Sequence, residues 1–169
     1  RYTYHDFDTR LKILASGLSR HGIRHGDVVA VMDWDTHRYF ECFFAVPMLG
    51  AVLHTVNIRL APAQIAYTID HAEDDVILVH ADFLPLMEEV MPLVKRKVRL
   101  ILLRDDLAKD PECSFDFVTS YDEMMAGPAT DFEFPDFDEG TRATTFYTTG
   151  TTGEPKAVAY SHRQLVLHT

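Results

Sequence analysis

The sequence is poor in cysteine and basic residues, and it has no long apolar run. Its two cysteines, Cys42 and Cys113, form no CxxC or other ligand-type spacing, so a disulfide framework and a cysteine metal site are disfavoured. Acidic residues outnumber basic ones 26 to 16, and the formal net charge of -10 would repel a nucleic-acid backbone. No run approaches the roughly 20 apolar residues of a membrane span, and the opening RYTYHDFDTR lacks a signal-peptide core. We therefore expect a cytoplasmic protein without a nucleic-acid partner or a transmembrane segment.

Apolar strands and amphipathic helices alternate along the first hundred residues. The chain has 169 residues, 47% of them hydrophobic, which suits one domain with a buried core. Strands are predicted at VVAVM (28–32), VLHTV (52–56), VILVH (76–80) and VRLILL (98–103), and helices at about 4–22, 37–50, 61–73 and 85–95. The first helix has Thr3 as its cap, with Asp6 three residues on. This alternation predicts an α/β fold, with a mainly parallel sheet covered by helices on both faces.

The alternation stops between about Asp105 and Gly140. The stretch DFEFPDFDEG alternates acids with aromatics around Pro135. Such a pattern is typical of an extended, exposed connector that carries apolar anchors. We therefore predict a looser connector over about 105–140, and we favour it over a cluster of catalytic carboxylates.

The stretch TTGTTGEPKAVAYSHR occupies positions 148–163 and lies between two strand-like segments. TTFY (144–147) precedes it and AVAYS (157–161) lies at its end, and both are rich in β-branched and aromatic residues. The glycines therefore lie in a strand-to-strand connection. A Walker A loop is excluded, because it needs adjacent Gly and Lys at a helix start and Glu154 and Pro155 separate Gly153 from Lys156.

The residue types of this loop suit a phosphate. Glycines permit left-handed backbone conformations that turn successive N–H groups toward an anion, and threonine hydroxyls add short donors. Lys156 adds a full positive charge, and Pro155 stiffens the chain before it. The predicted phosphate-contacting residues of the loop at 147–157 are Thr148, Thr149, Gly150, Thr151, Thr152, Gly153 and Lys156.

YTTGTTGEPKAV resembles the phosphate-loop signature of the adenylate-forming enzymes, which include acyl-CoA synthetases, firefly luciferase and peptide-synthetase adenylation domains. RYTYHDF resembles the opening motif of the family, and MLGAVLHTVNIRLAPAQIAY resembles its second motif, so the resemblance covers essentially all 169 residues. GAVLHTVNIRL together with the loop is most similar to the medium- and long-chain fatty-acid CoA ligases. Two positions depart from the pattern: Thr145 replaces an apolar residue, and Ala157 replaces the glycine that follows the lysine.

The resemblance implies a ligase that uses ATP, Mg²⁺ and coenzyme A to convert a carboxylate, most simply a fatty acid, into an acyl-adenylate and then an acyl-CoA. It implies that Lys156 is catalytic, that the loop holds the β- and γ-phosphates, and that the Thr148 hydroxyl contributes to the metal shell. It also allows a homodimer and peripheral membrane contact. In the family the adenine, ribose and hinge segments and the small C-terminal domain come later. We therefore expect residues 1–169 to be the N-terminal part of the adenylation domain, inactive alone.

Two alternatives stay open from the sequence. The chain could belong to another adenylate-forming enzyme, such as an aryl-CoA ligase or a luciferase-like or carrier-charging relative, or it could be a non-catalytic nucleotide-binding module. Among other residues, His54 is interpreted as a buried, hydrogen-bonded histidine, and His162 either caps a helix or approaches the nucleotide. The aromatic residues are interpreted as helix packing against the sheet in preference to an acyl tunnel. They are Trp34, Tyr39, Phe40, Phe43 and Phe44.

Overall fold

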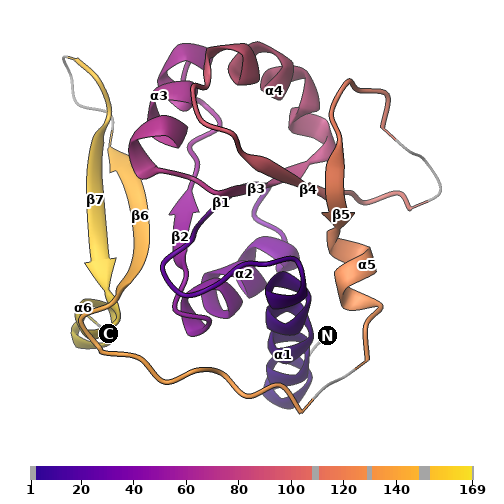
Figure 1. Ribbon diagram of the computed structural model, residues 1–169, viewed down its shortest axis with the longest axis vertical. Helices are drawn as coiled ribbons and strands as arrows, with labels where there is room; N and C mark the ends of the chain where they lie inside the picture. Colours follow the sequence, from indigo (N-terminus) through magenta and orange to yellow (C-terminus); the bar gives the residue numbers. More distant parts are fainter. Residues whose placement is uncertain (1–2, 108–110, 129–130, 149–152, 169) are drawn as a thin grey trace.

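The computed structural model describes residues 3–107, 111–128, 131–148 and 153–168, and it shows one sheet between two layers of helices (Figure 1). The strands are β1 (Val28–Met32), β2 (Val52–Thr55), β3 (Val76–His80), β4 (Arg99–Leu103), β5 (Phe117–Ser120), β6 (Arg142–Thr148) and β7 (Lys156–Ser161). The helices are α1 (Tyr4–Arg20), α2 (His37–Met48), α3 (Pro62–Ala72), α4 (Leu84–Val90), α5 (Tyr121–Met125) and α6 (His162–Leu167). The predicted α/β class is confirmed.

The strands lie side by side in the order β5-β4-β3-β1-β2-β6-β7. All neighbours from β5 to β6 are parallel, and β7 alone is antiparallel because it returns from β6 as a hairpin. The parallel strands therefore bring their carboxyl ends to one edge, where the loop after β6 also emerges. In Figure 1 the β6–β7 hairpin stands at one side of the sheet and β5 at the other.

The core has two halves, one on each face of the sheet. In β1, Val29 and Val31 face α1 and α2, while Ala30 and Met32 face α3 and α4. All five residues of β1 and all five of β3 are buried. The continuous apolar runs predicted from the sequence arise because both faces of these strands are covered. Among the described residues, no helix is both long enough and apolar enough to span a bilayer.

The start of α1 agrees with its sequence signal. The Thr3 hydroxyl accepts a hydrogen bond from the Asp6 amide at 3.1 Å, and the Asp6 carboxylate accepts one from the Thr3 amide at 2.9 Å. These reciprocal bonds satisfy two of the amides that a helix start leaves unpaired. Leu14 and Leu18 of α1 share one buried core with Val29 of β1, so the helix lies directly against the sheet.

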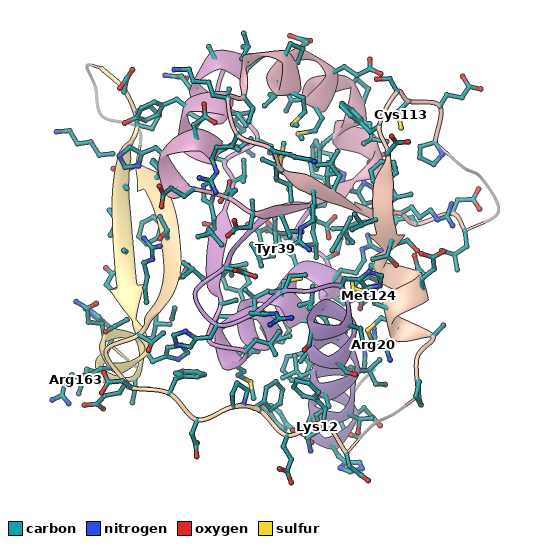
Figure 2. The ribbon with its side chains drawn as sticks, viewed as in Figure 1. Lys12, Arg20, Tyr39, Cys113, Met124 and Arg163 are labelled. Carbon is teal, nitrogen blue, oxygen red and sulfur yellow. The ribbon has the colours of Figure 1, made fainter. Side chains whose placement is uncertain are left out.

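Two segments differ from the sequence interpretation. The segment 105–140 contains β5 and α5, which were not predicted, and α5 packs on α1 where Met124 meets Gly17 (Figure 2). A Cβ on Gly17 would lie 2.7 Å from the Met124 Cβ, so the close approach of the two helices needs a glycine there. The helix predicted over 85–95 ends at Val90 and continues only as a 3-10 turn at Met91–Leu93, because Pro92 has no N–H for the helical ladder.

Candidate functional site

The β6–β7 hairpin carries the predicted phosphate loop. Its antiparallel ladder runs from Arg142–Ser161 to Thr148–Lys156, so Thr148 and Lys156 face each other at the mouth of the loop. Both residues are exposed. A hydroxyl and an ammonium group are thus brought together at the carboxyl edge of the parallel strands, which is the edge where α/β sheets bind their ligands.

The structure describes three of the seven predicted site residues: Thr148, Gly153 and Lys156. Gly153 has a φ of 104°, a conformation that side chains other than glycine rarely adopt. Ala157, which departs from the family pattern, lies in β7 and is not among the described residues with positive φ. Thr149, Gly150, Thr151 and Thr152 lie outside the described residues.

Among the described residues, no carboxylate neutralises the positive charge of Lys156 at the loop mouth. Lys156 forms no ion pair with a carboxylate of these residues, although the chain as a whole has a net charge of -10. An ammonium group without a protein partner is available to an anionic ligand. The same described residues contain no cluster of three or more His, Cys, Asp or Glu side chains that could hold a metal.

Tyr147, next to Thr148, ties the loop to the body of the domain. Its side chain is buried, and its hydroxyl lies 2.8 Å from Nδ1 of His71 near the end of α3. Burial raises the pKa of Tyr147, so the hydroxyl keeps its proton and can serve as donor or acceptor to either tautomer of His71. This contact joins the first arm of the loop to a helix 76 residues earlier in the sequence.

A buried polar pair lies beneath the Tyr147 ring. Nδ1 of His54 on β2 donates to the two carboxylate oxygens of Asp74 at 3.0 and 2.8 Å, and both residues are fully buried. The His54 and Tyr147 rings are 5.2 Å apart between centroids. Burial raises the pKa of Asp74, while the neighbouring His54 acts in the opposite direction. The interpretation of His54 as a buried, hydrogen-bonded histidine agrees with this geometry.

His162 does not cap the helix that it begins. The Ser161 hydroxyl accepts from the Gln164 amide and is the cap of α6. The His162 ring packs against Phe137 with centroids 4.7 Å apart, and its burial lowers its pKa. Since β7 separates it from Lys156, His162 lies at the opposite end of the hairpin from the loop.

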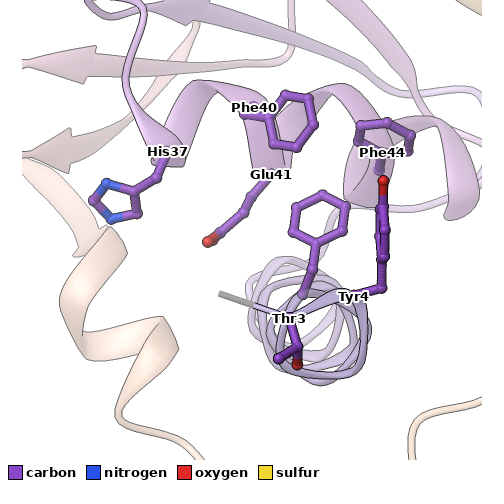
Figure 3. Close-up of a pocket in the computed structure, with 7 residues that line it drawn as sticks. Thr3, Tyr4, His37, Phe40, Glu41 and Phe44 are labelled. Atoms are coloured by element: carbon purple, nitrogen blue, oxygen red, sulfur yellow. The ribbon is translucent and has the colours of Figure 1, made fainter. Parts of the chain in front are cut away.

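The interpretation of the aromatic residues as packed against the sheet is wrong for four of the five. Tyr39 packs on the core, but the other four are between 42% and 55% exposed: Trp34, Phe40, Phe43 and Phe44. Phe40 and Phe44 line an apolar cavity of about 500 Å³ between α1 and α2, together with Phe7 (Figure 3). The apolar stripe of α2 is wider than the sheet can cover, which helical periodicity alone did not reveal.

Comparison with known proteins gives the chain a family. A family model described as AMP-binding enzyme matches residues 1–169. A 3-methylmercaptopropionyl-CoA ligase from Ruegeria pomeroyi is 41% identical over 92% of this chain and 29% of its own length. A long-chain-fatty-acid–CoA ligase from Thermus thermophilus is 40% identical over 99% of this chain and 29% of its own length. The chain therefore spans about 30% of the length of these relatives.

Solved structures show the same fold. An anthranilate CoA ligase, solved in complex with anthranoyl-AMP, superimposes with a TM-score of 0.82 at 22% identity, over 95% of this chain and 30% of that one. A luciferase-like enzyme from the mealworm Zophobas morio gives a TM-score of 0.79 at 25% identity, over 95% of this chain and 36% of that one. The sheet order and the hairpin described above thus belong to a known architecture.

Proposed function

The chain belongs to the AMP-binding enzyme family, and we propose that the complete protein is an acyl-CoA ligase that activates a fatty acid. In the first half-reaction a carboxylate oxygen attacks the α-phosphorus of ATP, the bond to the bridging oxygen of the β-phosphate breaks, and acyl-adenylate and pyrophosphate form. In the second, the thiolate of coenzyme A attacks the acyl carbon and AMP leaves. ATP and coenzyme A are therefore the proposed co-substrates.

The proposed role of the hairpin is to hold the departing pyrophosphate. The observation that carries this role is the pairing of Thr148 with Lys156 at the loop mouth, with both side chains exposed and Lys156 without a carboxylate partner among the described residues. Negative charge grows on the leaving group as the bond breaks, and donors aimed there lower the barrier most. Lys156 is the proposed catalytic residue for that reason.

The donor set also fits a magnesium ion held mainly by its substrate. Mg²⁺ prefers oxygen ligands, keeps several waters, and in nucleotide sites is held by one or two protein groups together with the phosphates. Thr148 offers one exposed hydroxyl oxygen at the loop mouth. When bound, the ion would neutralise charge on the phosphates, and Thr148 would be its ligand from this part of the chain.

The proposed acyl substrate is a fatty acid. A fatty acid is favoured by the resemblance of GAVLHTVNIRL and by the long-chain relative that covers 99% of the chain. The 3-methylmercaptopropionyl-CoA ligase has nearly the same identity, so a short thioether carboxylate is the main competitor. A panel of fatty, aromatic and short carboxylates, scored by pyrophosphate release from the complete protein, separates them. A cytoplasmic location and a homodimer stay predictions from the sequence.

Lys156→Ala in the complete protein tests the role of the hairpin. We expect carboxylate-dependent exchange of pyrophosphate into ATP to fall about a hundredfold or more, because one transition-state donor is worth about 3 to 4 kcal/mol. Thioester formation from supplied acyl-adenylate should change little, since pyrophosphate has already left. Lys97, also exposed but in the turn before β4, provides the matched control Lys97→Ala. Equal losses in both half-reactions would contradict the assignment.

A further inference from the structure

The first arm of the loop extends beyond its support in the sheet. Pairing between β2 and β6 ends at Thr55 with Phe146, whereas β6 continues to Thr148. Tyr147 and Thr148 then pair only with Ala157 and Lys156 of β7, which is an edge strand. Backbone pairing to β2 therefore does not hold the end of β6 that leads into the loop.

Side chains replace the missing ladder at this point. The Tyr147 hydroxyl bonds Nδ1 of His71 at 2.8 Å, and the two rings meet edge to face at 5.7 Å between centroids. Tyr147 is 8% exposed, and it packs with Ala72 at the end of α3 in a small apolar cluster. A single hydroxyl thus joins the residue before Thr148 to the rigid end of a helix.

The end of α3 is itself held in place. The helix closes in a Schellman motif, in which the Glu73 amide donates to the Asp70 carbonyl and the Asp74 amide donates to the Ile69 carbonyl. That turn buries Asp74, whose carboxylate accepts from His54 on β2. A buried pair of this kind is seldom the most stable solution, because apolar side chains of similar volume often serve as well. The cost in stability of burying His54 and Asp74 is explained if the pair fixes the end of α3 against β2.

The second arm of the loop approaches the same helix. Pro155 is buried, and Glu154 lines a cavity of about 470 Å³ whose other walls come largely from α3, with His71 among them. His71 therefore bonds to the first arm of the hairpin and lines a cavity together with Glu154 of the second. Thr148 and Lys156 pair with each other across the hairpin, so fixing α3 relative to the two arms fixes the position of this pair relative to the sheet.

We propose that Tyr147 and His71 are positioning residues, and that their hydrogen bond sets where the loop presents Thr148 and Lys156 to the triphosphate. This inference rests on the proposed function. His71 is exposed, so water can replace the lost partner and the bond contributes little to folding. Loss of this hydrogen bond should therefore slow the first half-reaction.

Tyr147→Phe tests the inference with one atom removed and the ring retained. We expect kcat/KM for MgATP in pyrophosphate exchange to fall about five- to tenfold, the worth of one hydrogen bond. Thioester formation from supplied acyl-adenylate should stay within twofold. Tyr160→Phe is the matched control, because Tyr160 lies on β7 of the same hairpin and its hydroxyl has no hydrogen-bond partner among the described residues.

Rescue and coupling distinguish positioning from a general structural role. His71→Ala should match Tyr147→Phe, and the double variant should be no worse than either single one, because both remove the same bond. His71→Asn, whose side-chain amide can reach the position of Nδ1, should restore most of the activity. Losses that add up in the double variant, or equal losses in both half-reactions, would overturn the inference.

Amide hydrogen exchange provides a readout that needs no activity. In the nucleotide-free protein, Tyr147→Phe should speed exchange at the amides of residues 147, 148 and 156 more than Tyr160→Phe does, while β1 and β3 keep their protection. Equal exchange in the two variants refutes the positioning role even if the enzyme is active. If the wild-type protein supports no pyrophosphate exchange into ATP with any carboxylate, the proposed function is refuted instead. The role of the hydrogen bond is then tested by amide hydrogen exchange alone.

Discussion

Two polar regions lie at the same edge of the sheet, and they differ in how their charges are satisfied. One is a crevice at the ends of β1, β3 and β4, where His80, Asp82 and Asp105 line a cavity of about 400 Å³. It includes the topological switch point, because β2 and β3 extend from opposite sides of β1. The other is the β6–β7 hairpin. The general rule for open α/β sheets favours the switch point as the ligand site. In this chain the pairing of charged side chains favours the hairpin as the ligand site.

The charges of the switch-point crevice are paired with one another. Arg38, 5% exposed, lies 3.6 Å from the Asp33 carboxylate and 2.7 Å from that of Asp105. The Trp34 indole donates to Asp82 at 2.8 Å, and His80 lies 3.5 Å from the same carboxylate. Groups paired in this way hold the strand ends together. At the hairpin, by contrast, Thr148 and Lys156 are exposed and face each other at the mouth of the loop.

Arg38→Met should have the largest effect, a loss of stability. The substitution leaves the buried Asp33 without its cation, and removal of one partner of a buried ion pair costs about 3 kcal/mol of unfolding free energy. Chemical denaturation of the complete protein measures the loss. Arg24→Met, at an exposed turn, should change the midpoint by much less. The rate of the proposed adenylation should stay within about twofold in folded Arg38→Met, and a collapse of that activity without destabilisation would move the proposed site to the crevice.

Gly153→Ala should reduce activity more than stability, and its free-energy change should be smaller than that of Arg38→Met. A φ of 104° strains an alanine by about 1 to 3 kcal/mol, and no atom of the described residues, chain neighbours aside, lies within 4 Å of the added Cβ. The hairpin can relieve that strain by shifting, which would displace Thr148 and Lys156 and slow adenylation roughly tenfold.

Gly26→Ala is the matched control for this prediction. Gly26 has a φ of 90° and equally open surroundings, but it lies in the turn before β1. Its strain should therefore appear in the denaturation midpoint and leave pyrophosphate exchange unchanged. If the two glycine variants lose activity equally, the hairpin has no special part in adenylation.

The sequence predicts the central elements of the fold well because their signals are local. The apolar runs of β1 to β4 and the Thr3 capping box act within a few residues, and the structure confirms them. β5 and α5 are short, and they depend on elements distant in sequence, because β5 pairs with β4 and α5 packs on α1, so periodicity misses them. The capping box of Ser120 with Glu123 was a readable sign of α5. The bond between Tyr147 and His71 joins residues 76 positions apart, and one sequence holds no local signal for it.

The smallest predicted effect is the pH dependence of the crevice. The hydrogen bond from Arg38 lowers the pKa of Asp105 below its ordinary value of 3.8. A carboxylate with a lowered pKa in the folded state stabilises the protein above its ordinary pKa, and that contribution is lost as the pH falls through the lowered value. Asp105→Asn should therefore be less stable than the wild type above about pH 4, and the two should converge below it. Asp131→Asn, on the exposed connector, is the control. Because the Asp105 carboxylate is 75% exposed, solvent screening keeps the difference small, and denaturation midpoints at closely spaced pH values are needed to detect it.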